Sequence, residues 1–136
     1  MDKKALKVYY CSAMDGLRPS DISDEYKRVE LILTAKKCTL INPYNDAMGG
    51  LAFTKENADL IVNENLKILA NADVVLINFS IKNHTYVGCI GEMIHAKINK
   101  LKVISFVGDN DIGNHFWTLY HSDHIVKTLD EAMTLL

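Results

Sequence analysis

The chain has 136 residues, of which 49% are hydrophobic and 24% charged, and its formal net charge is -2. This length suits one domain with a continuous core, so we expect a single domain over residues 1–136. The slight acidic excess argues against a nucleic acid or an anionic membrane as a partner, because proteins that bind either normally carry a basic surface.

The chain contains three cysteines at unrelated spacings and no apolar run long enough for a signal peptide or a membrane span. An odd number of cysteines fits a reducing compartment better than a disulfide framework, so we predict a cytoplasmic protein. Cys11 and Cys38 stand in apolar runs and are expected in the core. His121 and His124 have a spacing that metal ligands use, but the pattern lacks further ligands. We predict neither a metal nor another cofactor.

The first part of the chain predicts a strand, a helix and a second strand. "LKVYYC" at residues 6–11 predicts the strand, and a polar loop follows it. Apolar residues at helical spacing predict a helix over about 21–37, with Ser20 or Ser23 as its N-cap. "CTLI" at residues 38–41 predicts the second strand.

The middle of the chain begins with its longest irregular segment, residues 42–53, and loops of this length in a compact domain are often functional. A second helix is predicted over about 54–71. Its expected buried stripe consists of Ala58, Ile61, Val62, Leu66 and Leu69. "DVVLINF" at residues 73–79 is almost entirely apolar, as expected for a central parallel strand covered on both faces.

The last part of the chain predicts three further elements and a closing helix. The pattern predicts a helix over about 88–99, strands at 102–107 and 124–127, and a helix over 128–136 that a Thr-x-x-Glu capping box opens. Between the last two strands, three aromatic residues are expected in the core, with a lid or a dimer contact as the alternative: Phe116, Trp117 and Tyr120.

Strands that alternate with helices at this spacing imply right-handed crossovers and a parallel sheet. We predict an α/β three-layer sandwich with a five-stranded sheet in the order 2-1-3-4-5, flavodoxin-like or Rossmann-like. Such sheets bind ligands beyond the carboxyl ends of their strands, where the winding reverses. This topology places "CSAMDG" at residues 11–16 beside "SIKNHTYVGCIGE" at residues 80–92.

Glu92 follows the third predicted strand, within the first turns of a helix. Gly88 and Gly91 leave the preceding backbone open to a ligand. A helix N-terminus favours the ionised carboxylate, which suits a nucleophile. The alternative is an acid that only complements the helix dipole. Cys89 is a second possible nucleophile, but it needs a base that only His84 or His95 offers locally, so Glu92 is preferred.

Four segments match one family in order. "KVYYCSAMDG" resembles the opening strand and substrate loop of the nucleoside 2-deoxyribosyltransferase superfamily, which includes the deoxynucleoside 5′-monophosphate N-glycosidases. "NENLKILANADVVLINF" is similar to their helix and strand before the active site. "VGCIGEMIHAKINKLKVISFVGD" resembles their Gly-x-x-x-Glu-x-x-x-Ala segment, and "IVKTLDEAMTLL" resembles their closing strand and helix. The single motifs are short, so the ordered set, which covers nearly the whole chain, carries the resemblance.

The resemblance implies that Glu92 attacks the anomeric carbon of a nucleoside or nucleotide. The implied chemistry is that of a retaining glycosidase, with an oxocarbenium-like transition state and a covalent glycosyl-enzyme that water or a second base then captures. Tyr9 matches the tyrosine whose hydroxyl orients the carboxylate, and its alternative role is that of a core aromatic. Gly88 matches the glycine beside which the ligand approaches.

Two positions depart from the family pattern. Where the transferases carry an aspartate before the third strand, this chain has Asn65, whose amide can hydrogen-bond a base or sugar but cannot supply a proton. Where they place an aspartate before the Val-Gly pair, this chain has Tyr86, and the nucleotide-hydrolysing relatives bind a 5′-phosphate through a serine near there. Tyr86 or its neighbours His84 and Thr85 are expected to contact the substrate. The proton source for the departing base is unassigned.

The loop after the first strand bears on whether the substrate carries a phosphate. Ser12, the backbone amides around Gly16, and Arg18 together form a set that can hold a phosphate through charge-assisted hydrogen bonds. Asp15 can instead contact sugar hydroxyls. The alternative is an ordinary solvated loop with an exposed arginine.

We therefore expect an enzyme that cleaves the N-glycosidic bond of a nucleoside or its 5′-monophosphate, by hydrolysis or by base exchange, with hydrolysis slightly preferred. The alternatives are a nucleotide-binding module of the same fold that lacks efficient catalysis, and a glycohydrolase of a larger nucleotide such as NAD. The family's relatives build their sites at subunit contacts, so the resemblance also implies a homodimer or a higher homo-oligomer.

Overall fold

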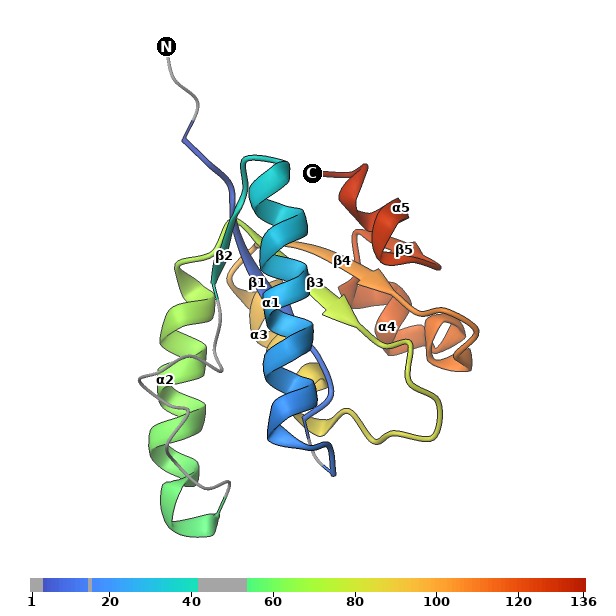
Figure 1. The fold of residues 1–136 in the computed structure, drawn as a ribbon. Helices are drawn as coiled ribbons and strands as arrows, with labels where there is room; N and C mark the ends of the chain where they lie inside the picture. Colours follow the sequence, from blue (N-terminus) through green and yellow to red (C-terminus); the bar gives the residue numbers. More distant parts are fainter. Residues whose placement is uncertain (1–3, 15, 42–53) are drawn as a thin grey trace.

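Five parallel strands form one sheet in the order β2-β1-β3-β4-β5, as the sequence predicted (Figure 1). The computed structural model describes residues 4–14, 16–41 and 54–136. The strands are β1 (Lys7–Cys11), β2 (Thr39–Ile41), β3 (Val74–Asn78), β4 (Lys102–Phe106) and β5 (His124–Val126). The winding reverses between β1 and β3, whose last paired residues are Cys11 and Ile77.

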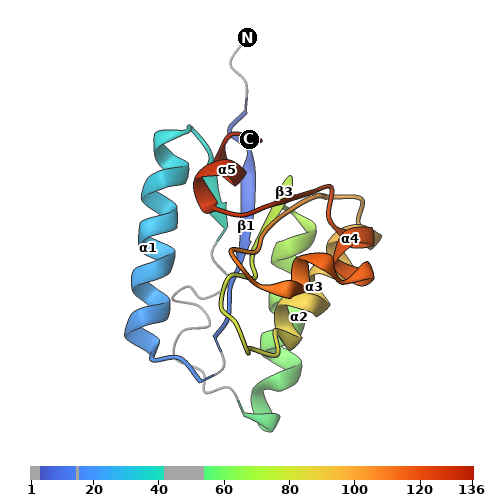
Figure 2. The ribbon, with the colours of Figure 1, turned by 90° about the vertical axis from the view of Figure 1, so that its right-hand side faces the viewer.

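Helices cover both faces of the sheet, which confirms the predicted three-layer α/β sandwich (Figure 2). One face carries α1 (Pro19–Ala35) and α5 (Leu129–Met133), and the other carries α2 (Ala58–Ala70), α3 (Val87–Ile98) and α4 (Phe116–His121). Two short 3-10 segments, η1 (Lys55–Asn57) and η2 (Asp111–Asn114), precede α2 and α4. No helix in the described part of the chain is both long and apolar enough to cross a membrane.

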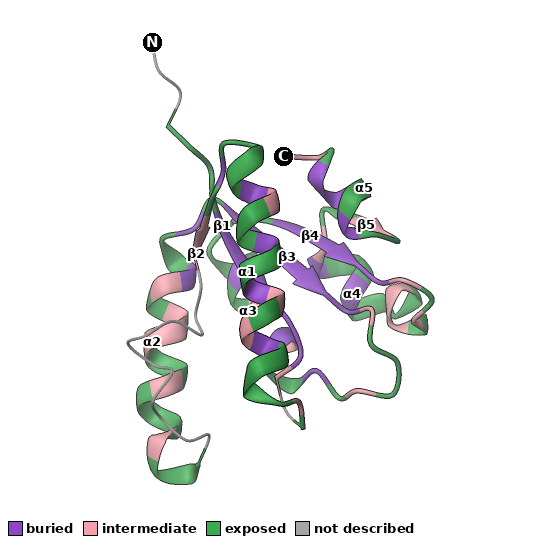
Figure 3. Cartoon of the chain, viewed as in Figure 1, coloured by how far each residue is buried: buried purple, intermediate pink, exposed green. Residues whose placement is uncertain are grey.

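Successive side chains of β1 point to opposite faces of the sheet, as the pleat requires. Val8 and Tyr10 join the core under α1 and α5, whereas Tyr9 and Cys11 join the core under α2 and α3. Every residue of β3 is buried (Figure 3). The alternation therefore sends one tyrosine hydroxyl toward each helical layer at the carboxyl edge of the sheet.

The helix termini follow the sequence only in part. α1 begins at Pro19, and its N-cap residue Arg18 makes no side-chain capping bond, so the prediction of Ser20 or Ser23 as the N-cap was wrong. Proline at the first helical position replaces that signal, because its fixed φ suits a helix start and it leaves no free N–H. The capping box of α5 is confirmed: Thr128 Oγ1 accepts a hydrogen bond of 3.1 Å from the backbone N–H of Glu131.

Two predicted core regions lie at the surface. Within α2 only Leu69 is buried and Val62 is 53% exposed, because the N-terminal half of the helix extends past the sheet (Figure 1). Phe116, Trp117 and Tyr120 on α4 are also exposed, so their predicted core packing was wrong. The predicted functional loop at 42–53 lies outside the described residues.

Candidate active site

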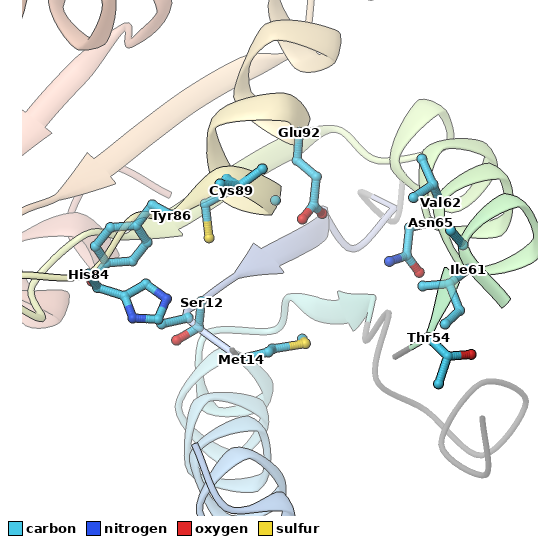
Figure 4. Close-up of a pocket in the computed structure, with 14 residues that line it drawn as sticks. Ser12, Met14, Thr54, Ile61, Val62, Asn65, His84, Tyr86, Cys89 and Glu92 are labelled. Atoms are coloured by element: carbon cyan, nitrogen blue, oxygen red, sulfur yellow. The ribbon is translucent and has the colours of Figure 1, made fainter. Parts of the chain in front are cut away.

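A cavity of about 310 Å³ lies beyond the carboxyl ends of β1 and β3, at the point where the winding reverses (Figure 4). Its lining comes from the loop after β1 (12–14), from Thr54 and α2 (58–65), and from the β3–α3 loop with the first turns of α3 (84–92). This volume is within the range of small-molecule sites.

Glu92 is the sixth residue of α3 and lines this cavity. Figure 4 shows its carboxylate pointing into the open space that faces Asn65 of α2. The thiol of Cys11, at the end of β1, lies 3.6 Å from Glu92 Oε2 as a weak donor. A Cβ atom built at Gly88 would lie 3.9 Å from Glu92 Oε1, so this glycine keeps the approach to the carboxylate open.

Burial raises the pKa of Glu92 from 4.5 to about 7, and the neighbouring Tyr9 hydroxyl and Cys11 thiol only partly oppose this shift. The sequence had suggested that the helix N-terminus would favour the ionised form. Glu92 lies beyond the first turn, where the helix dipole acts most strongly, so desolvation outweighs that effect. At neutral pH the carboxyl group is therefore poised between its two protonation states.

Two buried side-chain polar atoms have no hydrogen-bond partner among the described residues: Tyr9 Oη and Asn65 Oδ1. Tyr9 Oη adjoins the Glu92 carboxylate but does not meet it in hydrogen-bond geometry. Burial and the Glu92 charge raise the pKa of Tyr9 well above its ordinary value, so this hydroxyl keeps its proton and can donate it in a hydrogen bond. Asn65 lines the cavity on the α2 side.

Tyr86 forms part of the cavity wall and also holds the β3–α3 loop together. Its hydroxyl accepts a hydrogen bond of 2.8 Å from the backbone N–H of Ile81 and donates one of 3.1 Å to the carbonyl of the same residue. Its ring packs edge-on against Phe79 and His84. Tyr86 adopts a left-handed conformation with φ of 55°. The hydroxyl is thus engaged with the backbone, while the ring faces the cavity, where His84 also lies.

The four predicted residues of the first loop separate in the structure. Ser12 lines the cavity, and its hydroxyl donates a hydrogen bond of 2.7 Å to Glu25 Oε2. Gly16 has φ of 77° and does not line the cavity. Arg18 is exposed and forms an ion pair of 2.8 Å with Asp21, outside the lining. Asp15 lies outside the described residues.

Glu25 was not identified from the sequence. This carboxylate lies at the same edge of the sheet as Glu92 but on the other face, and it accepts hydrogen bonds from three donors. Glu25 Oε1 accepts hydrogen bonds of 2.9 Å from both Tyr10 Oη and Asn78 Nδ2, and Glu25 Oε2 accepts the bond from Ser12. A signal was present, since position 25 lies three residues after Ile22 and therefore on the edge of the buried stripe of α1. Cys11 was expected only as a core residue, yet it contacts Glu92.

Structural comparison relates the chain to three solved structures. The 2-deoxyribosyltransferase from Bacillus psychrosaccharolyticus superposes with a TM-score of 0.69 at 15% identity, over 93% of this chain and 89% of that one. A conserved protein from Enterococcus faecalis V583 superposes with a TM-score of 0.67 at 14% identity, over 96% of both chains. The 2-deoxyribosyltransferase from Leishmania mexicana gives a TM-score of 0.58 at 17% identity, over 76% of this chain and 65% of that one.

The chain has the 2-deoxyribosyltransferase fold. By sequence, no family model and no curated protein matches the chain. The three-dimensional comparison therefore confirms the fold that the sequence resemblance implied, at 14–17% identity. Within the described residues, no group of three or more His, Cys, Asp or Glu side chains is placed to hold a metal ion.

Proposed function

We propose that this cavity cleaves the N-glycosidic bond of a nucleoside or of its 5′-monophosphate, with Glu92 as the nucleophile. The observation that carries the proposal is the pairing of a desolvated Glu92 with the two unpartnered buried atoms, Tyr9 Oη and Asn65 Oδ1. Buried polar atoms without a partner are rare in folded proteins. A ligand in the cavity can complete the hydrogen bond of Asn65 Oδ1, whereas Tyr9 Oη lies beside the Glu92 carboxylate outside the lining. A nucleoside offers polar groups for such bonds.

The reaction that fits this arrangement has two displacement steps. An ionised Glu92 oxygen attacks the anomeric carbon, a carbon–oxygen bond forms, and the carbon–nitrogen bond to the base breaks with its electron pair leaving on nitrogen. Water or a second base then attacks the same carbon and releases Glu92 as a carboxylate. Hydrolysis and base exchange differ only in the nucleophile of the second step, which is water in hydrolysis and a free base in exchange. The cavity is open, so water can reach the glycosyl-enzyme.

Tyr9 and Asn65 have separate tasks in this proposal. In the reacting complex, Tyr9 Oη, which adjoins the carboxylate, moves into hydrogen-bond geometry and holds one of its oxygens, so that the other faces the sugar. Asn65 offers both a donor and an acceptor to the departing base, but an amide has no acidic proton to give. The base therefore leaves with a proton from solvent or from another group of the site. Gly88 keeps the approach to Glu92 free of side-chain atoms.

The test is an incubation of the protein with the four common 2′-deoxynucleosides and their 5′-monophosphates, followed by chromatography for free base. Addition of a second free base then separates exchange from hydrolysis. A 2′-fluoro nucleoside slows both steps by destabilising the oxocarbenium-like transition state, and mass spectrometry of the protein should then show a glycosyl adduct on the peptide that contains Glu92.

Free base together with an adduct on that peptide is the expected result. Binding of nucleosides without release of any base would instead favour a non-catalytic binding module, and an adduct on Cys89 would transfer the nucleophile role to that thiol. We also propose, from the family resemblance, that the protein assembles as a homodimer or higher homo-oligomer, which light scattering in solution can measure.

A further inference from the structure

The hydroxyl proton of Ser12 is directed away from the cavity that Ser12 lines. Ser12 Oγ donates its one proton to Glu25 Oε2 at 2.7 Å. Glu25 accepts two further bonds, from Tyr10 Oη and Asn78 Nδ2, through its other oxygen. A carboxylate that accepts three hydrogen bonds and donates none is satisfied in its ionised form. With its proton given to Glu25, Ser12 Oγ has only acceptor lone pairs to offer a ligand, and the Glu25 carboxylate lies next to it.

The described lining contains no arginine or lysine, and His84 is its one basic side chain. Arg18, the nearest arginine in sequence, is exposed and paired with Asp21 outside the lining. Residue 15 and the segment 42–53 contain no lysine, arginine or histidine in their sequence, so they add no basic side chain of their own. The cavity is therefore poor in the charge-assisted donors that phosphate sites use.

We propose that this arrangement selects a nucleoside with a free sugar hydroxyl over its 5′-monophosphate, and that Glu25, acting through Ser12, is the specificity-determining residue. This inference rests on the proposed function, because it concerns the substrate of the same cavity. A sugar hydroxyl can donate to the lone pairs of Ser12 Oγ. A phosphate carries close to two negative charges at neutral pH and only acceptor oxygens. It can therefore form no hydrogen bond with the lone pairs of Ser12 Oγ, and the Glu25 carboxylate repels it.

The penalty on the phosphate is larger inside the protein than it would be in water, because the low local dielectric strengthens repulsion between like charges. A specificity built in this way needs no contact between Glu25 and the substrate. It requires only that the Ser12 proton be held by Glu25, which the distance of 2.7 Å shows. Glu25 is thus a positioning residue that sets the hydrogen-bonding polarity of Ser12.

The substitution Glu25→Gln tests this directly, because it should reverse that polarity. The glutamine Oε1 can keep the bonds from Tyr10 and Asn78, while its Nε2 replaces the oxygen that now accepts from Ser12. Ser12 Oγ then accepts from this amide and turns its own proton toward the cavity. The same substitution at Glu30, an exposed residue of α1, is the matched control.

The measurement is calorimetric binding of each 2′-deoxynucleoside and its 5′-monophosphate, made in a Glu92→Gln background so that no ligand is consumed. We expect the nucleoside to bind at least about tenfold more tightly than the monophosphate. Glu25→Gln should tighten monophosphate binding by about tenfold and change nucleoside binding by less than about threefold. Glu30→Gln should change neither.

Tighter binding of the monophosphate before any change at Glu25 overturns the proposal, and so does equal loss of both ligands in a folded Glu25→Gln variant. If that variant does not fold, the comparison of the two ligands in the Glu92→Gln background still decides. Failure of the proposed function is a different result: nucleosides bind with the expected preference, but the unaltered protein releases no base. Absence of binding by either ligand overturns both.

Discussion

Two carboxylates lie at the carboxyl edge of the sheet, one on each face, and they differ in how many hydrogen bonds they accept. Glu25, on the α1 face, accepts three hydrogen bonds of 2.7 to 2.9 Å. Glu92, on the α2 and α3 face, has a single weak thiol donor at 3.6 Å and a tyrosine hydroxyl that adjoins it without bonding. The pleat of β1 supplies one tyrosine to each: Tyr10 to Glu25 and Tyr9 to Glu92.

The difference shows that neighbouring tyrosines of one strand, β1, lie beside two acids in very different environments. Hydrogen bonds to the ionised form compensate Glu25 for its partial burial, so it can serve as a fixed part of the framework. Glu92 is desolvated with little compensation, and burial raises its pKa to about 7. An acid left in this state costs folding free energy, and such sites are enriched in functional residues.

The largest expected effect comes from Glu92→Gln, which removes the proposed nucleophile while keeping the shape of the side chain. Turnover should fall by about 10⁴-fold, and the rate of free base release measures it. The same variant should unfold at a higher temperature at neutral pH, because the neutral amide avoids the cost of burying an ionised acid. For the unaltered protein, the pKa is raised on folding, so the free energy of unfolding should decrease as the pH rises from about 4.5 to about 7. Unchanged turnover would exclude Glu92 from the chemistry.

Glu25→Ala should have the opposite effect on stability. It leaves the donors of Tyr10, Ser12 and Asn78 without their shared acceptor, so the free energy of unfolding should fall by about 2 kcal/mol. Urea denaturation measures the change, with Glu30→Ala on the exposed face of α1 as the control. If the free energy of unfolding falls no more than in the control, water replaces the three hydrogen bonds, and Glu25 does not have the structural role assigned to it here.

The sequence predicted the sheet order and the position of Gly88 and Glu92 at its carboxyl edge from strong local patterns, whereas the place of Tyr9 beside Glu92 was implied by the family resemblance. Strand alternation, short βα units and glycines around an acid need no knowledge of distant contacts. Glu25 could not be recognised in the same way. Its role depends on donors from β1, β3 and the loop after β1, which only the folded chain brings together.

The predicted positions at the periphery failed for a related reason. Apolar spacing on α2 and α4 predicted burial, but burial also requires a surface that covers the side chain fully. Val62 faces the cavity and Trp117 is covered on one ring face by His121, so both remain about half exposed. The left-handed φ of Tyr86 also could not be predicted from the sequence, because tyrosine rarely adopts this conformation. Its hydroxyl is held by the backbone of Ile81, a contact that no spacing rule predicts.

The substitution Tyr9→Phe should lower turnover less than Glu92→Gln does, and it tests the role of the tyrosine beside Glu92. If the Tyr9 hydroxyl donates to Glu92 during the reaction, its loss should lower kcat by about tenfold to a hundredfold, with little change in KM. Steady-state kinetics measures the two parameters. The matched control is Tyr26→Phe, which also removes a buried hydroxyl but one that donates to the Tyr10 carbonyl. Equal effects in both variants would assign Tyr9 to core packing alone.

Cys11→Ala should alter the pH profile more than the maximal rate. In the proposed reaction the ionised Glu92 is the reactive form, so kcat/KM should rise with pH around a midpoint near 7. The Cys11 thiol lowers the Glu92 pKa, and its removal should move this midpoint to higher pH. Cys38→Ala, which removes another buried thiol far from the site, should leave the profile unchanged. A shift to lower pH would mean that water entering the vacated space stabilises the carboxylate better than the thiol does.

The smallest expected effect is that of Arg18→Ala, and it separates the two accounts of the first loop. As a phosphate ligand, the role that the sequence suggested, Arg18 would have to leave Asp21 and turn into the cavity, and its loss would then weaken monophosphates more than nucleosides. The polarity that Glu25 imposes on Ser12 predicts no such selectivity. We expect kcat/KM for both ligand classes to change by less than about twofold, because an exposed ion pair at i,i+3 contributes little. A selective loss for the monophosphate would restore Arg18 as its ligand and would mean that Glu25 does not decide the choice of substrate.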